Sequence, residues 1–351
     1  MTARKTGLPW WQPLCLWALL ALLPPVAPAG AYVHVDSFTW SEPVSIRAAL
    51  NDWQGAFRGG EEQFTYDWLE AGVTRGAWGV GLLYRYDYAL RFSPDTAEFY
   101  HRDRNDLPVD PERRWDLRLS AQHFVARGLR LSTARRARPG LRWRAGLSLL
   151  QADDLIDGHI RGTDRQARVD YFYSEDALFH RQVAPPDGLG LSLDLAVDWQ
   201  ATARLALHGE AVDLPGAIWW RDAPFTDVTA NADRRVEETD GIPALAPLVS
   251  GREGLRRRWR QGLSPRALLR ADYRLRGGLG ARLALRRMNG RWRGGLGARW
   301  AAGDGRLSLD WWPALGLWQA GWSSPRVTLA LGADRADDEA HALRLRLSLR
   351  Y

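Results

Sequence analysis

Apolar and polar residues alternate through most of the chain. The C-terminal end shows this most clearly, because Leu343, Leu345, Leu347 and Leu349 alternate with Arg or Ser, and the chain ends on Tyr351. A period of two predicts a β-strand with one apolar and one polar face. Runs of about ten such residues, separated by turns, are typical of a transmembrane β-barrel.

Sixteen segments follow this alternation. The predicted strands are 45–57, 61–72, 75–92, 112–126, 128–136, 140–152, 165–175, 187–200, 202–213, 266–276, 278–288, 291–301, 306–312, 315–323, 325–334 and 341–351. Fourteen strands remain open as an alternative, because the first strand, the connection 153–164 and Arg276-Gly277-Gly278 are weakly marked. An even number puts both termini on the periplasmic side, and the connections 93–111, 176–186 and 214–264 on the extracellular side.

Two dipeptides predict tight hairpin turns. Asn289-Gly290 and Asp304-Gly305 are typical of type I′ turns, across which the polar face must change from even to odd positions or back. The polar face is even at Arg286, odd at Arg293 and even again at Arg306, as two-residue turns require.

Tryptophan gathers near the ends of the predicted strands, on their apolar faces. These residues are Trp78, Trp115, Trp143, Trp199, Trp292, Trp300, Trp311 and Trp322. Aromatic girdles at the two membrane interfaces have this placement. A periplasmic β-sandwich, with tryptophan as ordinary core, is the alternative.

The last strand resembles the C-terminal signal strand of Gram-negative outer-membrane β-barrel proteins, a porin-like class. The resemblance implies an all-β fold, a transmembrane antiparallel up-and-down barrel of about 14–16 strands. It also implies a place in the cell outer membrane among lipid and lipopolysaccharide. Periplasmic chaperones and the barrel-assembly machinery would then recognise an assembly signal formed by Leu343, Leu345, Leu347, Leu349 and Tyr351.

The N-terminal residues predict a secretory signal peptide. Arg4 and Lys5 precede the apolar run 14–23, and small residues suited to cleavage follow at 27–31. We therefore expect residues 1–31 to be a signal peptide and 32–351 to form a single barrel. Cys15 is the one cysteine in the sequence, so the remainder offers no disulfide and no cysteine metal site.

Charge is unevenly distributed. Residues 30–213 carry a net charge of −5 and residues 214–351 carry +10, with fifteen arginines against Glu253 and Asp272 within 251–300. Eight arginines are predicted to face the lumen as an anion-binding wall: Arg270, Arg274, Arg276, Arg282, Arg286, Arg291, Arg293 and Arg299. They could line a pore that selects anions, or neutralise acids of the earlier strands across a plugged lumen. Both interpretations remain open.

The connection 214–264 is predicted as a long loop that is acidic at its start and basic at its end. It could fold into the lumen. It could also stand outside, where Arg256, Arg257, Arg258 and Arg260 would bind anions such as lipopolysaccharide phosphates.

No catalytic, phosphate-binding or dinucleotide motif is found, and no histidines have metal-ligand spacing. His208 beside Glu210, and His123 on the predicted lipid face, are the candidates that a lipid-modifying enzyme would use. Lysine occurs once in the sequence, so the arginine excess reflects genome composition as much as function, and the pI of 9.9 is not interpreted as a sign of a nucleic-acid partner. We expect no cofactor and no metal.

The leading hypothesis is a porin-like channel for small polar or anionic solutes. The alternatives are a non-conducting barrel that binds or assembles partners through 214–264 and, third, the lipid-modifying enzyme.

Overall fold

The protein is described from a computed structural model that places residues 30–110, 112–176, 182–231, 238–239, 242–243 and 249–351. Residues 1–29 of the predicted signal peptide lie outside these ranges. The strands are β1 (Ala31–Ser41), β2 (Glu62–Arg75), β3 (Trp78–Phe92), β4 (Asp116–Arg138), β5 (Leu141–Thr163), β6 (Gln166–Tyr173), β7 (Asp187–Gln200), β8 (Leu205–Val212), β9 (Gly216–Asn231), β10 (Glu238–Thr239), β11 (Ile242–Pro243), β12 (Val249–Gly262), β13 (Arg266–Arg274), β14 (Gly280–Met288), β15 (Arg291–Ala302), β16 (Gly305–Trp312), β17 (Leu317–Ser323), β18 (Val327–Ala333) and β19 (Ala342–Arg350). The helices are α2 (Ile46–Ala49), α3 (Pro94–Arg104) and the 3-10 turn η1 (Pro313–Leu315).

Fourteen strands close into one antiparallel ring. β1 pairs with β2 on one side and with β19 on the other, so the ring has no open edge. The order around the ring is β1, β2, β3, β4, β5, β7, β8, β13, β14, β15, β16, β17, β18 and β19. This confirms the predicted up-and-down barrel, at the lower strand number of the expected range.

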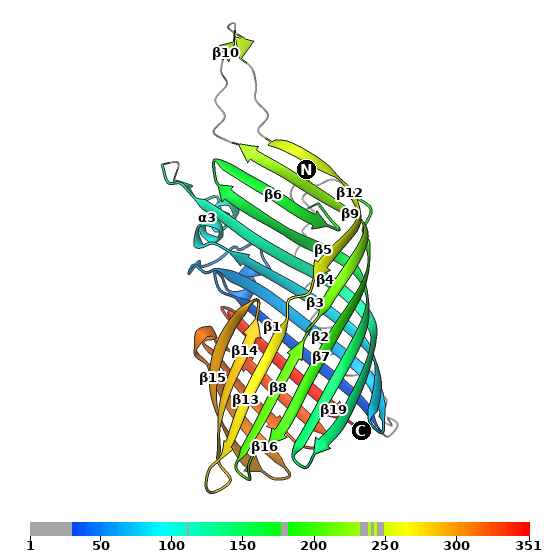
Figure 1. Cartoon of the computed structure of the whole chain (residues 1–351). Helices are drawn as coiled ribbons and strands as arrows, with labels where there is room; N and C mark the ends of the chain where they lie inside the picture. Colours follow the sequence, from blue (N-terminus) through cyan, green and yellow to red (C-terminus); the bar gives the residue numbers. More distant parts are fainter. Residues whose placement is uncertain (1–29, 111, 177–181, 232–237, 240–241, 244–248) are drawn as a thin grey trace.

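Three further strands prolong the ring on one side. β6 continues into β7 across 174–186, β9 continues β8 beyond 213–215, and β12 continues into β13 through 263–265. β6 pairs with the upper part of β5 and with β9, and β9 pairs with β12. The result is a tall wall that rises above the closed ring, with β10 and β11 paired at its tip (Figure 1).

The two ends of the barrel differ in their connections. At the end where the C-terminus lies (Figure 1), each connection between neighbouring ring strands has at most five residues. The opposite end carries α2, α3 and the tall wall. Outer-membrane barrels have short turns on the periplasmic side and long loops outside, so the tall wall is extracellular.

A belt of apolar side chains surrounds the ring. Leu82 is 68% exposed and Leu283 is 61% exposed, and the register places further exposed leucines at the same level on β4, β5 and β7. Trp78, Trp199 and Trp292 are exposed at strand ends. A closed barrel with an outward apolar belt and aromatic girdles is the outer-membrane type, and the protein is an outer-membrane β-barrel. Among the described residues, no helix is long and apolar enough to cross a membrane, which says nothing about crossing by strands.

The first predicted strand is wrong. Residues 45–57 contain α2 and irregular chain, because the Ser45 side chain accepts a hydrogen bond from the N–H of Ala48 and starts a helix there. The first strand is β1, which begins at Ala31, the last residue of the predicted signal peptide. Its two faces both carry aromatic or β-branched residues, so the alternation that marks a barrel strand is weak.

Three other predicted boundaries change. The predicted strands 112–126 and 128–136 are one strand, β4, and the predicted connection 153–164 belongs to β5. The predicted loop 214–264 contains β9 and β12, so it forms part of the tall wall and is not a lumen loop. These strands lie above the membrane, where polar side chains can face solvent. Their sequences therefore lack the regular alternation of apolar and polar residues.

The hairpin predictions differ in accuracy. Asn289 and Gly290 both have positive φ, as the predicted type I′ turn requires. The second turn lies one residue earlier than predicted, because Ala302 pairs with Gly305 and the positive φ belongs to Gly303.

Trp115 is not in a girdle, since it is buried against Phe99 of α3.

Side chains fill the extracellular half of the ring. One cluster brings together Leu83, Phe124, Leu155, Phe172, Ile218 and Trp220. A second brings together Phe38, Phe64, Tyr66, Met288, Trp312 and Leu317. Gly295 lies against the second cluster, where a Cβ would stand 2.8 Å from the Trp312 ring. The lumen at this level is therefore packed as a protein core.

The outward belt gives a first testable expectation. Leu283→Arg places a charge on the lipid face of β14 and should lower the free energy of unfolding in lipid vesicles by about 2–4 kcal/mol. Leu255→Arg, at an equally exposed position on the tall wall, should cost at most about 1 kcal/mol, because solvent surrounds that wall. Denaturant titration of both variants measures the difference. Equal losses would contradict the assigned membrane level.

Candidate functional site

The periplasmic half of the barrel encloses an open space. Two cavities of about 450 Å³ and 360 Å³ share several lining residues, among them Arg142, Arg286 and Arg346. The larger cavity reaches the turn between β2 and β3, at the periplasmic end. We call this joint space the arginine chamber.

Arginine dominates the lining of the arginine chamber. Twelve arginines and six carboxylates line the two cavities. The alternation of each strand explains this, since the leucines of β14 and β19 face lipid and the intervening arginines face inward. A polar lumen is general among membrane barrels. Here arginines outnumber carboxylates two to one in the lining, which gives this lumen a positive field.

Asp272 neutralises three of the predicted arginines. Its carboxylate lies 2.7 Å from Arg282 Nε, 2.7 Å from Arg299 and 3.4 Å from Arg270. Arg282 also binds Asp310 at 2.8 Å. These arginines face the lumen as predicted, but they are paired with acids of their own strand or of a strand one or two positions away in the ring. Their predicted role in binding anions stays a prediction.

Arg291 and Arg293 lie in the extracellular mouth. Arg291 pairs with Glu61 and Arg293 with Glu62, and Asn289 donates to Glu62 at 3.4 Å and to the Leu90 carbonyl at 3.1 Å. β14 and β2 lie on opposite sides of the ring, so the β14–β15 turn reaches across the mouth. We call these contacts the β14–β15 latch.

Two further predicted residues lie outside the chamber. Arg274 and Arg276 are exposed at the periplasmic turn between β13 and β14. The sequence placed them in the lumen because their positions have the same parity as Arg270. The turn begins earlier than expected, since the N–H of Leu275 bonds to Leu279 and both Gly277 and Gly278 have positive φ.

Three arginines that line the smaller cavity have no ion-pair partner among the described residues: Arg142, Arg286 and Arg350. Arg286 is nearly buried and lies over the rings of Trp312, at 4.7 Å, and Phe38, at 5.6 Å. The anion site predicted from sequence included Arg286 but missed Arg142 and Arg350. Their alternation with Leu141 and Leu349 was the available signal.

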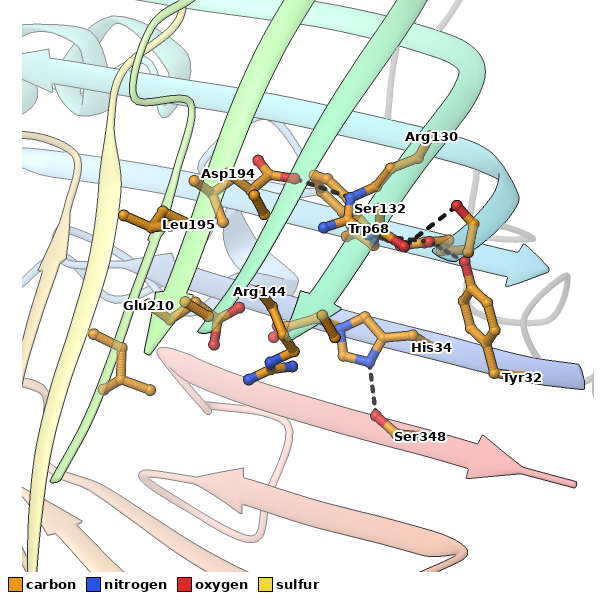
Figure 2. Close-up of a pocket in the computed structure, with 18 of the residues that line it drawn as sticks. Tyr32, His34, Trp68, Arg130, Ser132, Arg144, Asp194, Leu195, Glu210 and Ser348 are labelled. Atoms are coloured by element: carbon orange, nitrogen blue, oxygen red, sulfur yellow. Dashed lines mark hydrogen bonds and ion pairs between the residues drawn. The ribbon is translucent and has the colours of Figure 1, made fainter. Parts of the chain in front are cut away.

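The larger cavity mixes these charges with polar and aromatic groups. Arg130 binds Asp194 at 2.9 Å and Glu70 at 3.4 Å, and Glu70 accepts from Tyr32 at 2.5 Å (Figure 2). His34, two residues from Tyr32 on β1, contacts the Ser348 hydroxyl at 2.7 Å (Figure 2). These pairs hold the side chains of the cavity wall in place. The arginines without an ion-pair partner are then the uncompensated charge of the chamber.

A buried ion cluster separates the arginine chamber from the filled half. Arg85 of β3 is fully buried and donates to Asp213 at 2.8 and 2.9 Å and to Asp87 at 2.7 Å. Arg266 of β13 approaches Asp213 at 3.5 Å, and Ser192 donates to it at 2.7 Å. β3 and β13 are not neighbours in the ring, so this cluster joins separate walls across the lumen.

Short helices and loops cover the extracellular rim. Ser93 caps α3, and His101 of that helix contacts the Gly55 carbonyl at 3.0 Å and stacks on Phe57 at 4.7 Å. The Asp95 carboxylate of α3 accepts a hydrogen bond from the N–H of Asp116 and pairs with the Arg113 guanidinium, and these contacts hold the pKa of Asp95 below its usual range. The bond to Asp116 also ties α3 to β4. The rim is a fixed cover over the packed half.

The four predicted loop arginines divide between the faces of β12. Arg256 lies over the rings of Phe225 and Phe172, at 5.2 and 6.0 Å, on the inner face of the tall wall. Arg258 and Arg260 lie on the outer face, because their register partners are Arg221 and Trp219. Arg257 is exposed at an irregular position opposite Asp222, which has positive φ.

The two candidate histidines contact acids and backbone. His123 contacts the Asp87 carbonyl at 2.8 Å and Asp154 at 3.2 Å, and packs between Tyr86 and Tyr88. His208 lies between Asp198, at 2.7 Å, and Glu210, at 3.5 Å. Neither contacts a hydroxyl nucleophile within the described residues. The described part of the chain also contains no group of three or more His, Cys, Asp or Glu able to hold a metal ion.

Comparison with known proteins finds a likeness in structure. No model of a protein family matches the sequence, and no curated protein matches it. The barrel is similar to the toluene transporter TodX of Pseudomonas putida, with a TM-score of 0.45 and 8% identity over 92% of this chain and 88% of that one. It is also similar to a FadL homologue of Pseudomonas aeruginosa (TM-score 0.34, 9% identity, 91% and 86% covered) and to the toluene transporter TbuX of Ralstonia pickettii (0.33, 9%, 93% and 90%).

The buried ion cluster gives the second expectation. Asp213→Asn leaves Arg85 with Asp87 alone and should lower the free energy of unfolding by about 3 kcal/mol, because a buried charge loses its partner. Asp116→Asn breaks the exposed pair with Arg118 and should cost less than about 1 kcal/mol. Denaturant titration in the same vesicles compares them. A loss at Asp213 no larger than at Asp116 would show that the cluster does not hold the walls together.

Proposed function

We propose that this protein is an outer-membrane channel for small anionic solutes and that the structure represents its closed state. The arginine chamber is the proposed selective element. The closure lies in the packed half, the buried ion cluster and the β14–β15 latch.

The surplus of arginine in the chamber carries the proposal. Arginine remains charged at all relevant pH values and binds carboxylate or phosphate with two parallel hydrogen bonds. Arg142, Arg286 and Arg350 have no ion-pair partner among the described residues, so they can bind a solute without first breaking an ion pair. Rings of basic side chains favour anions in other pores.

The latch supports a closed state that can open. Its contacts join the β14–β15 turn to Glu61, Glu62 and the Leu90 carbonyl on the opposite wall, and no backbone ladder joins these two walls. Side-chain bonds of this kind can break while the closed ring below stays intact. The turn is therefore the part of the mouth that can move without loss of strand pairing.

The filled extracellular half favours one alternative, a non-conducting barrel that binds partners through 214–264. This segment forms β9 and β12 and stands above the membrane. A barrel that never conducts, even after release of the latch, would support that alternative over the channel.

Export and assembly complete the proposal. We infer that residues 1–31 direct secretion and that Leu343, Leu345, Leu347, Leu349 and Tyr351 serve as the assembly signal for periplasmic chaperones and the barrel-assembly machinery. The support is that β19 pairs with both β18 and β1 and so completes the ring.

Anion selectivity is tested by planar-bilayer recording across a KCl gradient. We expect a reversal potential that reports anion preference, and a shift towards cations in Arg142→Gln/Arg350→Gln, because two unpaired positive charges leave the chamber. The matched control is Arg127→Gln/Arg135→Gln, which removes two exposed arginines of β4 at positions in phase with the outward Leu129 and Leu131 and should leave the reversal potential unchanged. Cation preference in the wild-type protein would refute the proposal.

Latch release is tested in the same recordings. Glu62→Gln and, separately, Asn289→Ala weaken the bonds across the mouth, and hydrogen bonds to charged groups contribute about 1.5–3 kcal/mol. We expect opening events to become about tenfold more frequent in Glu62→Gln, with a smaller increase in Asn289→Ala. Asp116→Asn, at an exposed ion pair on the same extracellular end, is the control and should open as the wild type does. Unchanged opening in both latch variants would show that the latch does not close the channel.

A further inference from the structure

The outer face of the tall wall carries a charged patch directly above the apolar belt. Leu189, Trp219 and Arg260 form one row across β7, β9 and β12, and the next row upward is Asp187, Arg221 and Arg258. Register partners in antiparallel strands share a face. Leu189 is 59% exposed and Trp219 is 46% exposed on that face. The three arginines therefore lie where the lipid-facing surface ends.

The arginines of this patch repel one another. Arg221 and Arg258 are direct register partners, and like charges placed opposite each other destabilise a sheet. None of Arg221, Arg258 and Arg260 forms an ion pair with a described residue. Asp187 is the register partner of Arg221, yet no ion pair joins them. The patch therefore has an uncompensated positive charge.

The opposite face of the same strands is different. There Arg252 and Arg168 both bind Asp227, at 3.4 and 3.0 Å, and Arg256 lies over Phe225. Acidic side chains thus neutralise arginines on this face of the wall, whereas the arginines of the outer patch have no such partner among the described residues. An external anion would compensate its charge.

We propose that Arg221, Arg258 and Arg260 bind the phosphate groups of lipid A in the outer leaflet. Guanidinium groups bind phosphate with two parallel hydrogen bonds. Tryptophan favours the membrane interface, so Trp219 and Leu189 contact the acyl chains below the phosphates. The site lies outside the lumen and is independent of the proposed channel activity.

The site is tested on the purified full-length barrel in detergent by native mass spectrometry, which counts bound lipid A molecules. The wild-type barrel should bind diphosphoryl lipid A more tightly than monophosphoryl lipid A or phosphatidylglycerol. Arg221→Gln/Arg258→Gln/Arg260→Gln should weaken binding of diphosphoryl lipid A at least about tenfold, since several charge-assisted hydrogen bonds are lost. Arg252→Gln/Arg256→Gln, on the opposite face of β12, is the matched control and should bind within about twofold of the wild type.

Three results would overturn the site. They are equal binding of lipid A by the triple variant and the wild type, equal binding of phosphatidylglycerol and diphosphoryl lipid A by the wild type, and displacement of lipid A by equimolar inorganic phosphate. Heat-modifiable electrophoretic mobility confirms that each variant is a folded barrel. Trp219→Ser keeps all three arginines and should weaken binding less than the triple variant does, and a larger loss would also refute a site built on the phosphates.

Discussion

Closure of the sheet between β1 and β19 is the constraint on which the rest of the structure depends. Within lipid, every backbone N–H and C=O must find a partner inside the protein. The nine register pairs from Tyr32–Arg350 to Trp40–Ala342 supply these partners at the seam. Because the ring must close, each strand presents one face to lipid and the other to the lumen, and this division forces arginine inward and leucine outward.

The inward arginines then need partners of their own. Asp272, Asp310, Asp36 and Glu210 neutralise five of the twelve within the chamber wall. The same requirement acts more strongly at Arg85, which is fully buried. Its pairing with Asp213 links two walls that the backbone does not connect. Electrostatics thus determines the shape of the lumen, whereas hydrogen bonding of the backbone determines the ring.

The sequence predicts the ring better than the site. Period-two alternation gives nearly correct bounds for strands such as β7 and β15, because a strand between lipid and lumen has two distinct environments. It fails at β1, β9 and β12, whose two faces do not differ in polarity. The lumen-facing positions of Arg282 and Arg299 follow from parity alone. Their neutralisation by Asp272 does not, because parity gives the face of a residue but not its distance from residues on other strands.

The breaks at 174–186, 213–215 and 263–265 separate the tall wall from the ring. The ring closes through β7, β8 and β13 without any contribution from β6, β9 or β12. Changes in the length or sequence of the wall therefore leave the membrane-spanning hydrogen bonds intact. The wall is the region where this barrel can change on the cell surface while the inserted part stays constant.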